Sequence, residues 1–323
     1  MATMTKEPES QRRLDDPGYR TLKDVPPEAD FIQQRRTRSE KTARAYQVDI
    51  DGFTAFIGIH KPEDYRAVTP KHIADWITHL KEQKLTNETI SRKISAVSSL
   101  FKYYCNRAAL KDNPCTNITR PKVESNVGKS DAISNSEARK LLDIPPADTL
   151  KGLRDRAILI VFLFHGLRRS EVKDLRVNSI HAVQGIPHLK VKGKGSKTRD
   201  LPLHPAALER INAYLEKDNR TGFLESPLFC QLRKRKDTDG NLKPLSTNMI
   251  YVLVMHYAEM VGIKIENFHP HSLRATWATN ALSNHADLAK VQDYLGHANI
   301  QTTKIYDKRT NTLADSPTFK VNY

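Results

Sequence analysis

Four short segments of the 323-residue chain gather arginine, lysine, histidine and tyrosine side chains. They are residues 165–171 (HGLRRSE), 192–199 (KGKGSKTR), 269–274 (HPHSLR) and 295–306 (LGHANIQTTKIY). A guanidinium grips two oxygens with its planar fork and does not lose its proton. Fixed cations of this kind stabilise the negative charge that grows on a phosphodiester when a side-chain oxygen attacks it. The segments could therefore support chemistry at a phosphate.

Each segment taken alone also has an ordinary structural interpretation. An arginine after a helix is usually a surface ion-pair partner, and a hairpin tip rich in lysine and glycine is usually a solvated turn. A tyrosine in a helical segment usually packs in a core. One His-x-x-Arg is near chance in a chain with 12 histidines. The functional interpretation therefore depends on the four segments occurring together.

Together and in this order, the segments resemble those of the tyrosine recombinases, the site-specific DNA recombinases that include phage integrases and Xer-type enzymes. The resemblance covers nearly all of residues 38–310. It consists of Gly-Leu-Arg-x-x-Glu, a Gly-Lys-Gly hairpin, His-x-x-Arg, and Leu-Gly-His followed nine residues later by tyrosine. Lys194 follows Arg168 by 26 positions and His271 follows Lys194 by 77, and both spacings fit the family. No long insertion interrupts the chain, and in this respect it resembles the simpler Xer-like, transposon and phage members, which also lack one.

The resemblance implies that Tyr306 is the nucleophile of a site-specific recombinase that cuts and rejoins DNA through a 3′-phosphotyrosyl intermediate. Strand exchange would proceed via a Holliday junction. Because the covalent link stores the energy of the broken bond, rejoining would need no ATP. The same resemblance implies that Arg168 and Arg274 clamp the phosphate and that His297 donates a third hydrogen bond to it.

Three further side chains receive roles from the resemblance. Lys194 would be the general acid that protonates the departing 5′-oxygen, with Lys192 and Lys197 as rival candidates. His271 would assist as a base or as a further phosphate ligand. Glu171 would hold a basic residue of the site in place.

We expect neither a metal ion nor another cofactor. The sequence has no carboxylate cluster with metal-ligand spacing and no Gly-x-x-x-x-Gly-Lys-Ser/Thr loop.

Two alternatives share the motifs: a type IB topoisomerase-like nicking and closing enzyme, and a non-catalytic DNA-binding protein on the same fold. The small helical front module favours a recombinase over the first alternative. The complete set of six site residues argues against the second.

One position departs from the family's pattern, and at another two neighbouring arginines could fill the same role. Many relatives have histidine directly after the second arginine, where this chain has Ala275. That histidine usually has a supporting role, so the difference concerns local packing. Arg168 and Arg169 form a doublet, and register with the preceding Gly-Leu favours Arg168 as the clamp residue. Arg169 is then a surface residue or a DNA contact.

The elements that must position these residues follow from hydrophobic periodicity and turn signals. The predicted fold class is mainly α-helical with a small β-sheet or hairpin. Residues 1–35 are expected to form a flexible lead-in, 36–120 a helical domain, 121–133 a linker, and 134–323 an α+β domain with a C-terminal tail. In the family's terms these are a SAM-like core-binding domain of about four helices and the tyrosine recombinase catalytic domain.

Several local signals fix element ends. Thr69-Pro70 predicts a helix start, and Ser134 with Glu137 predicts a capping box. The apolar run 157–164 predicts a buried helix that ends at Gly166, and a second helix is predicted to end at Gly262. Period-two alternation over 186–203 predicts a hairpin with a basic tip.

Composition supports a nucleic-acid partner. The chain carries 52 Lys+Arg against 37 Asp+Glu, a net charge of +15, and its isoelectric point is near 9.6. Such a surface most often binds nucleic acid, although a solvated basic surface is the simpler alternative.

No apolar run approaches the roughly 18 residues of a membrane helix. With only three scattered cysteines and no signal-like core, a reducing, cytoplasmic setting (bacterial cytoplasm or nucleoid) and no membrane partner are expected.

The resemblance also implies the partners. They would be a double-stranded DNA recombination site and three further copies of the chain, forming a homotetramer on two sites with a dimer on each. A second recombinase or an accessory DNA-bending protein is a further option. In the helical domain the candidate phosphate contacts are Lys41, Arg44, Arg92 and Lys93, and an exposed helix face is the alternative for each. The tail after Tyr306 is a candidate for docking on a neighbouring protomer.

Overall fold

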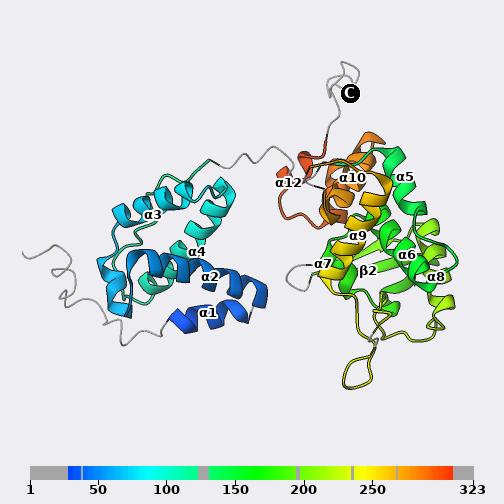
Figure 1. Cartoon of the computed structure of the whole chain (residues 1–323), viewed down its shortest axis with the longest axis horizontal. Coiled ribbons are helices and arrows are strands. Elements are labelled where there is room, and N and C mark those ends of the chain that lie inside the picture. The colour runs from blue at the N-terminus through cyan, green and yellow to red at the C-terminus, as the bar shows by residue number, and fades with distance from the viewer. Residues whose placement is uncertain are drawn as a thin grey trace, which may run out of the picture. The chain divides into compact units, whose positions relative to one another are not determined.

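The computed structural model describes residues 28–37, 39–122, 131–193, 197–233, 236–266 and 268–307. The chain divides into two compact units, residues 1–124 and 125–323 (Figure 1). The division falls inside the segment that the sequence assigns to a linker. Both units are mainly helical and the second contains one small sheet, which confirms the predicted fold class.

Unit 1 is built from helices around an aromatic core. Its α-helices and one 3₁₀ helix are α1 (Glu28–Arg36), α2 (Glu40–Ile57), η2 (Pro62–Ala67), α3 (Pro70–Glu82) and α4 (Asn87–Cys105). α3 begins where Thr69-Pro70 predicts, because the Thr69 side chain accepts a hydrogen bond from the backbone N–H of His72. The Phe53 ring packs edge-on against Trp76 and Phe101, which are buried with it.

Helix α1 corrects the prediction for the start of the chain. The sequence assigns residues 1–35 to a flexible lead-in, yet Glu28–Arg36 is helical and belongs to unit 1. Phe31 and Ile32 are 2% and 3% exposed, and Phe31 stacks edge-on against Tyr103 of α4. Two adjacent apolar residues give no periodicity, so only the tertiary contact reveals this helix. Residues 1–27 lie outside the described residues.

Unit 2 contains the remaining elements. They are α5 (Asn135–Asp143), α6 (Leu150–His165), α7 (Arg169–Asp174), η3 (Val177–Ser179), β1 (Ile180–Val183), β2 (Ile186–Lys192), β3 (Thr198–Pro202), α8 (Pro205–Lys217), α9 (Thr247–Val261), α10 (Pro270–Ser283), α11 (Leu288–Leu295) and α12 (Gln301–Lys304). The sheet order is β1-β2-β3, with both pairs antiparallel. The predicted hairpin is β2–β3. Strand β1 was not predicted from the sequence; it has four residues, and its buried and exposed positions do not alternate.

Helix α6 forms the centre of unit 2. Residues 157–162 are all buried, and the helix packs against α5, α8 and α10 (Figure 1). It ends at Gly166, whose φ of +57° lies in the left-handed region and whose N–H donates to the carbonyl of Phe162. α9 ends in the same way at Gly262, and Ser134 with Glu137 caps α5. These three local predictions are confirmed.

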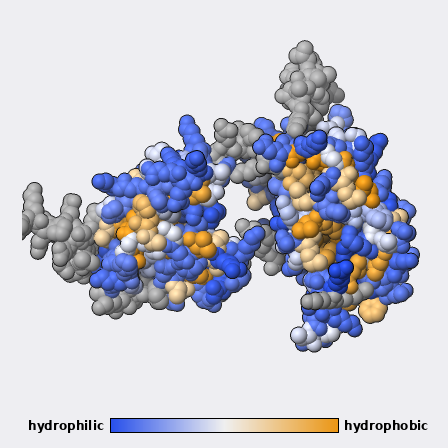
Figure 2. Space-filling model, viewed as in Figure 1, coloured by the Kyte–Doolittle hydropathy of each residue, from blue (hydrophilic) through white to orange (hydrophobic). Residues whose placement is uncertain are grey.

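The surface agrees with the charged composition. Hydrophilic residues cover most of the visible surface of both units (Figure 2). Hydrophobic residues gather in unit 2 where α9 lies, and Met249, Val252 and Met260 of this helix are 40%, 56% and 55% exposed. Among the described residues, no helix has both the length and the apolar character needed to span a bilayer.

Gly166 is expected to be the more sensitive of two comparable helix ends. In Gly166→Ala, a positive φ costs about 1–2 kcal/mol, and the added Cβ would lie 2.7 Å from Cε3 of Trp277, an overpacking worth about 1–3 kcal/mol. Gly262→Ala also has a positive φ, but no atom lies within 4 Å of its added Cβ. Urea unfolding of unit 2 in the full chain should show a loss of about 2–5 kcal/mol for the first variant and about 1–2 kcal/mol for the second. Equal losses would contradict the steric role of Trp277.

Candidate active site

Five of the six side chains to which the resemblance assigns catalytic roles lie in the described part of unit 2. Each is held at or near a helix end: Arg168 just before α7, His271 and Arg274 in the first turns of α10, His297 after α11, and Tyr306 after α12. The sixth, Lys194, lies outside the described residues, as does the tip of the β2–β3 hairpin.

Arg274 is the most deeply buried charge of the site, with an exposed fraction of 0%. Its Nη1 donates to the carbonyl oxygen of Gly166 at 2.6 Å. Its Nη2 donates to the carbonyl of Leu295 at 2.6 Å and lies 2.9 Å from Nε2 of His297. Both carbonyls stand at the ends of helices, where carbonyl groups lack an intrahelical partner. The Nε of Arg274 is buried and has no hydrogen-bond partner among the described residues.

Two arginines fix the buried carboxylate of Glu171. The Nη1 of Arg168 donates to Oε1 at 2.9 Å, and the backbone N–H of Arg168 donates to Oε2 at 2.8 Å. Arg199 of β3 adds a two-pronged pair, with Nη1 at 3.0 Å from Oε1 and Nη2 at 2.9 Å from Oε2. Burial acts to raise the pKa of Glu171, but the hydrogen bonds from Arg199 and Arg168 lower it overall. The ionised carboxylate thus orients both guanidinium groups.

His297 is held at both ring nitrogens. It follows Gly296, which ends α11 with a φ of +63°. Its Nε2 faces Arg274, and its Nδ1 lies 2.9 Å from Oγ1 of Thr303, a fully buried residue of α12. Gln292 also donates to the backbone carbonyl of His297 at 2.9 Å. The ring therefore has a fixed position between Arg274 and the helix that precedes Tyr306.

Tyr306 points its hydroxyl at a histidine. The residue is 5% exposed, and its hydroxyl oxygen lies 3.4 Å from Nε2 of His271. Its ring stacks near that of His297, with 6.5 Å between the centroids. The backbone N–H of His271 donates to Nδ1 of His269, which caps α10. A phenol oxygen and a possible proton acceptor are thus adjacent.

The site carries more positive than negative charge, because Arg168, Arg199 and Arg274 face the one carboxylate of Glu171. Burial, reinforced by the charge of Arg168, lowers the pKa of Arg274 to about 9, which leaves it protonated at neutral pH. Burial and the charges of Arg274 and Arg168 lower the pKa of His297 to about 4, so this ring is neutral. Such a cluster suits an anion.

Burial and the nearby positive charges also shift the pKa values of Tyr306 and His271. Desolvation, with the charges of Arg274 and His269, lowers the pKa of His271. Burial raises the pKa of Tyr306, while Arg274 and Arg168 act in the opposite direction. At neutral pH the pair is therefore a protonated phenol beside a neutral imidazole.

Comparison with known proteins assigns the chain to a family. Residues 132–312 match the phage integrase family, and residues 29–108 match the phage integrase N-terminal SAM-like domain. The tyrosine recombinase XerD of Lacticaseibacillus casei is 32% identical over 292 residues, which cover 88% of this chain and 94% of that protein. This chain belongs to the tyrosine recombinase family. The resemblance inferred from the four segments is thereby confirmed.

Other tyrosine recombinases agree in sequence and in fold. XerC of Herpetosiphon aurantiacus is 30% identical over 289 residues, covering 88% of this chain and 90% of that protein. The XerH site-specific recombinase in a post-cleavage complex with a palindromic difH substrate has a TM-score of 0.66 at 21% identity, covering 87% of this chain and 80% of that chain. A lambda integrase dimer bound to a COC′ core site has a TM-score of 0.64 at 17% identity, covering 88% and 96%. The two structures show that this recombinase shares their fold.

The structure places the other candidates of the catalytic unit on its surface or in its core. Arg169 is half-buried on α7 and lies over the ring of Tyr251, 5.5 Å from its centroid. Lys192 and Lys197 are exposed on either side of the hairpin tip. Ala275 is 1% exposed and belongs to the apolar cluster that includes Tyr306. Packing therefore fills the position where many relatives have histidine.

The four candidate DNA contacts of unit 1 fall into two pairs. Lys41 and Arg44 are exposed on α2. Arg92 and Lys93 of α4 both pair with Asp49, a carboxylate that is 1% exposed, and the Lys93 Nζ lies 3.2 Å from its Oδ1. Burying Asp49 requires these cations. Lys93, at 16% exposure, thus has a structural role, whereas Arg92 remains half exposed.

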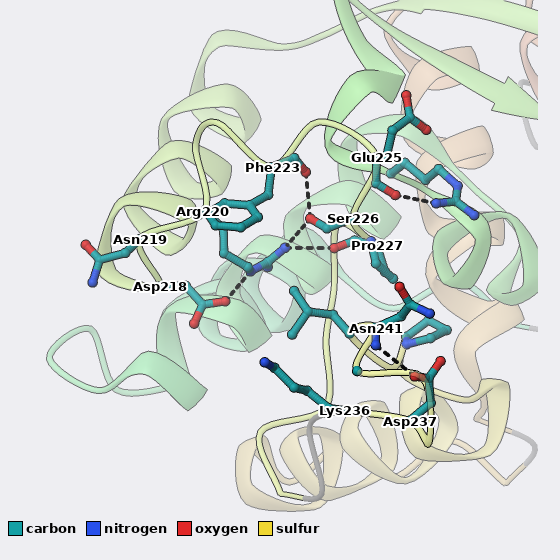
Figure 3. Close-up of a pocket in the computed structure, with 14 residues that line it drawn as sticks. Asp218, Asn219, Arg220, Phe223, Glu225, Ser226, Pro227, Lys236, Asp237 and Asn241 are labelled. Carbon is teal, nitrogen blue, oxygen red and sulfur yellow. Dashed lines mark hydrogen bonds and ion pairs between the residues drawn. The ribbon is translucent and has the colours of Figure 1, made fainter.

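No group of three or more possible metal ligands occurs among the described residues. A cavity of about 920 Å³ lies beside the end of α8, and none of the site residues lines it (Figure 3). Arg220 in its wall is 2% exposed and pairs with Asp218, while also donating to the carbonyls of Pro227 at 2.8 Å and Leu228 at 2.9 Å. This arginine holds the loop after α8.

No role was assigned from the sequence to two residues that belong to the recombinase site. Arg199 lies in the hairpin segment, and Thr303 lies three residues before Tyr306. Arg199 joins three segments, because it binds Glu171 and also donates from Nε to the carbonyl of Tyr294 at 2.8 Å. The only sequence feature that could have indicated a role for Arg199 is its position directly after a basic hairpin tip.

Loss of Arg199 should destabilise unit 2 more than loss of an arginine that pairs with an exposed carboxylate. Arg199→Ala removes charged hydrogen bonds to a buried carboxylate and is expected to cost about 2–3 kcal/mol in urea unfolding. Arg210→Ala is the control. Arg210 also pairs with a carboxylate and a carbonyl, those of Asp143 and Leu142, but Asp143 is 65% exposed, so we expect less than about 1 kcal/mol. Equal costs would contradict the role assigned to Arg199.

Proposed function

We propose that this protein is a site-specific DNA recombinase that cuts and rejoins DNA through a 3′-phosphotyrosyl intermediate on Tyr306. The observation that carries the proposal is the hydroxyl of Tyr306, 3.4 Å from Nε2 of His271 and next to a cluster of arginines with excess positive charge. A nucleophile, a proton acceptor and a binding site for an anion are thus adjacent.

In the proposed first step, the Tyr306 oxygen attacks the phosphorus and gives its proton to Nε2 of His271. A neutral imidazole is needed for this, and His271 is neutral at pH 7 because its pKa is lowered. The bound phosphate would weaken the repulsion from Arg274. It thereby raises the basicity of His271 at the moment the proton is transferred.

Negative charge would develop on the nonbridging oxygens, and three donors meet it. Arg274 is held in place by two carbonyls, Arg168 is oriented by Glu171 with a third of its side chain exposed, and His297 stands beside Arg274. Fixed donors of this kind stabilise a transition state without reorganising. Because these cations replace metal ions, the reaction would need neither metal nor ATP.

Lys194 would protonate the 5′-oxygen that leaves. It lies on the connection between β2 and β3, and Arg199 anchors the start of β3 to Glu171. The liberated 5′-hydroxyl of a second duplex then attacks the phosphotyrosyl link, which re-forms the phosphodiester and frees Tyr306. Two successive exchanges through a Holliday junction would complete recombination.

The proposed partner is a double-stranded DNA recombination site. The net charge of +15 and the similarity to recombinases crystallised on DNA sites support it. Lys41 and Arg44 are the proposed phosphate contacts of unit 1, with Arg92 in a second role beside Asp49. We propose a homotetramer on two sites, with or without a DNA-bending protein, acting in the bacterial cytoplasm.

The decisive test is covalent capture without metal. A binding site is first selected from random duplexes with Tyr306→Phe protein, and nicked versions of it are then incubated with wild-type protein in EDTA. We expect a protein–DNA adduct on a denaturing gel, absent in Tyr306→Phe and retained in Tyr251→Phe, which removes an exposed hydroxyl outside the site. No adduct on DNA that the protein binds, or an adduct that requires Mg²⁺, would overturn the proposal. Relaxation of a plasmid with two sites and no recombinant circles would favour the topoisomerase-like alternative.

The arginine clamp should act on the transition state rather than on binding. Arg168→Ala is expected to leave DNA affinity within a few-fold of wild type and to slow adduct formation about 10²–10³-fold, or about 2.7–4 kcal/mol. Arg274→Lys is the companion variant, because removing the whole buried side chain would strand the carbonyls of Gly166 and Leu295. Gel shift and adduct rate are measured on the same duplex. Equal losses in both would contradict a transition-state role.

A further inference from the structure

The contact between Arg274 and His297 fixes which nitrogen of the imidazole carries hydrogen. The Nη2 of Arg274 lies 2.9 Å from Nε2 of His297. A guanidinium can only donate hydrogen bonds, so Nε2 must accept and is unprotonated. A neutral imidazole carries one N–H, which therefore sits on Nδ1 and points to Oγ1 of Thr303 at 2.9 Å.

This arrangement is the opposite of the one that the proposed reaction needs. To donate a hydrogen bond to a phosphate oxygen beside Arg274, His297 must carry its hydrogen on Nε2. Protonating both nitrogens is disfavoured, since burial and the adjacent arginines keep the pKa of this ring near 4. The ring must therefore change tautomer when the phosphate binds.

Thr303 has the chemistry that such a change requires. A hydroxyl both donates and accepts, so the same oxygen can accept from Nδ1–H in one state and donate to a bare Nδ1 in the other. Thr303 is fully buried on α12, three residues before Tyr306. Rotation of the hydroxyl hydrogen therefore keeps the bond between Thr303 and Nδ1 in both tautomers.

We propose that Thr303 is a positioning residue that lets His297 switch from the Nδ1–H tautomer in the free protein to the Nε2–H tautomer on the phosphate. The proton on Nδ1 is released to water and one is taken up at Nε2, so the charge of the ring does not change. An oxygen between Arg274 and His297 then accepts from both. The inference about the bound state rests on the proposed function, whereas the tautomer of the free protein does not.

The first test reads the tautomer directly. The full chain is labelled with ¹⁵N-histidine, and His297→Gln identifies the resonances of His297. The nitrogen shifts are expected to show a bare Nε2 and a protonated Nδ1 in the free protein. Adding the selected duplex to Tyr306→Phe protein should reverse the pattern. An Nε2–H tautomer in the free protein, or no change on DNA, would overturn the inference.

The second test uses two neighbouring threonines. Thr303→Val keeps the shape and removes the hydroxyl, and it should slow adduct formation about 10- to 100-fold, as for partners that orient ligand histidines. DNA affinity should stay within about twofold of wild type, because Thr303 makes no proposed DNA contact. Thr303→Ser restores the hydroxyl and should recover most of the rate.

Thr302→Val is the matched control, because Thr302 is exposed and its hydroxyl donates to the carbonyl of Asn299 instead. Its adduct rate should match wild type. Equal rates for Thr303→Val and wild type would overturn the inference and leave the proposed function intact. Failure of wild-type protein to form any adduct would instead count against the proposed function, and the spectra of free protein would still test the tautomer.

Discussion

The buried guanidinium of Arg274 is the interaction on which the arrangement of the site depends. Moving a cation out of water costs several kcal/mol unless hydrogen bonds replace the lost hydration. Here the replacements are the carbonyls of Gly166 and Leu295, at the C-terminal ends of α6 and α11. Those ends carry the negative pole of the helix dipole and have unpaired carbonyls, which favours a cation. One side chain of α10 thus fixes the ends of two other helices.

The positions of the remaining site residues follow from this contact. Gly166 leads directly into the turn that carries Arg168, and Leu295 is followed by Gly296 and His297. Because both turns are tied to Arg274, the two cations and the imidazole converge. Tyr306 follows the short helix α12, and Thr303 of this helix is hydrogen-bonded to the His297 ring. The tyrosine recombinase site is therefore an assembly of helix ends around one buried charge.

The charge balance of the two units differs in kind. In unit 2, Glu171 neutralises only part of the positive charge of three arginines, and burial together with this excess lowers the pKa of Arg274, His271 and His297. An anion would relieve this repulsion. In unit 1, the buried Asp49 is matched by Arg92 and Lys93. A cation count alone would treat these residues alike, although Lys93 serves to bury a carboxylate and the arginines of unit 2 leave an excess of positive charge around one.

Local sequence determined several helix ends and the order of the motifs. Helix starts at Thr69-Pro70 and Ser134, and helix ends at Gly166 and Gly262, follow from interactions that reach at most a few residues along the chain. The motif residues and their spacing were likewise sufficient to identify the family.

Tertiary structure alone decided what each functional side chain touches. Arg274 reaches a carbonyl 108 positions away, and Arg199 reaches Glu171 across 28 positions. No periodicity signals such contacts, because they exist only once the helices and the sheet have packed. For the same reason neither the packing of α1 nor the bond between Thr303 and His297 could be predicted from the sequence. A pattern of residue types predicts which groups can react, and packing decides the hydrogen bonds that orient them.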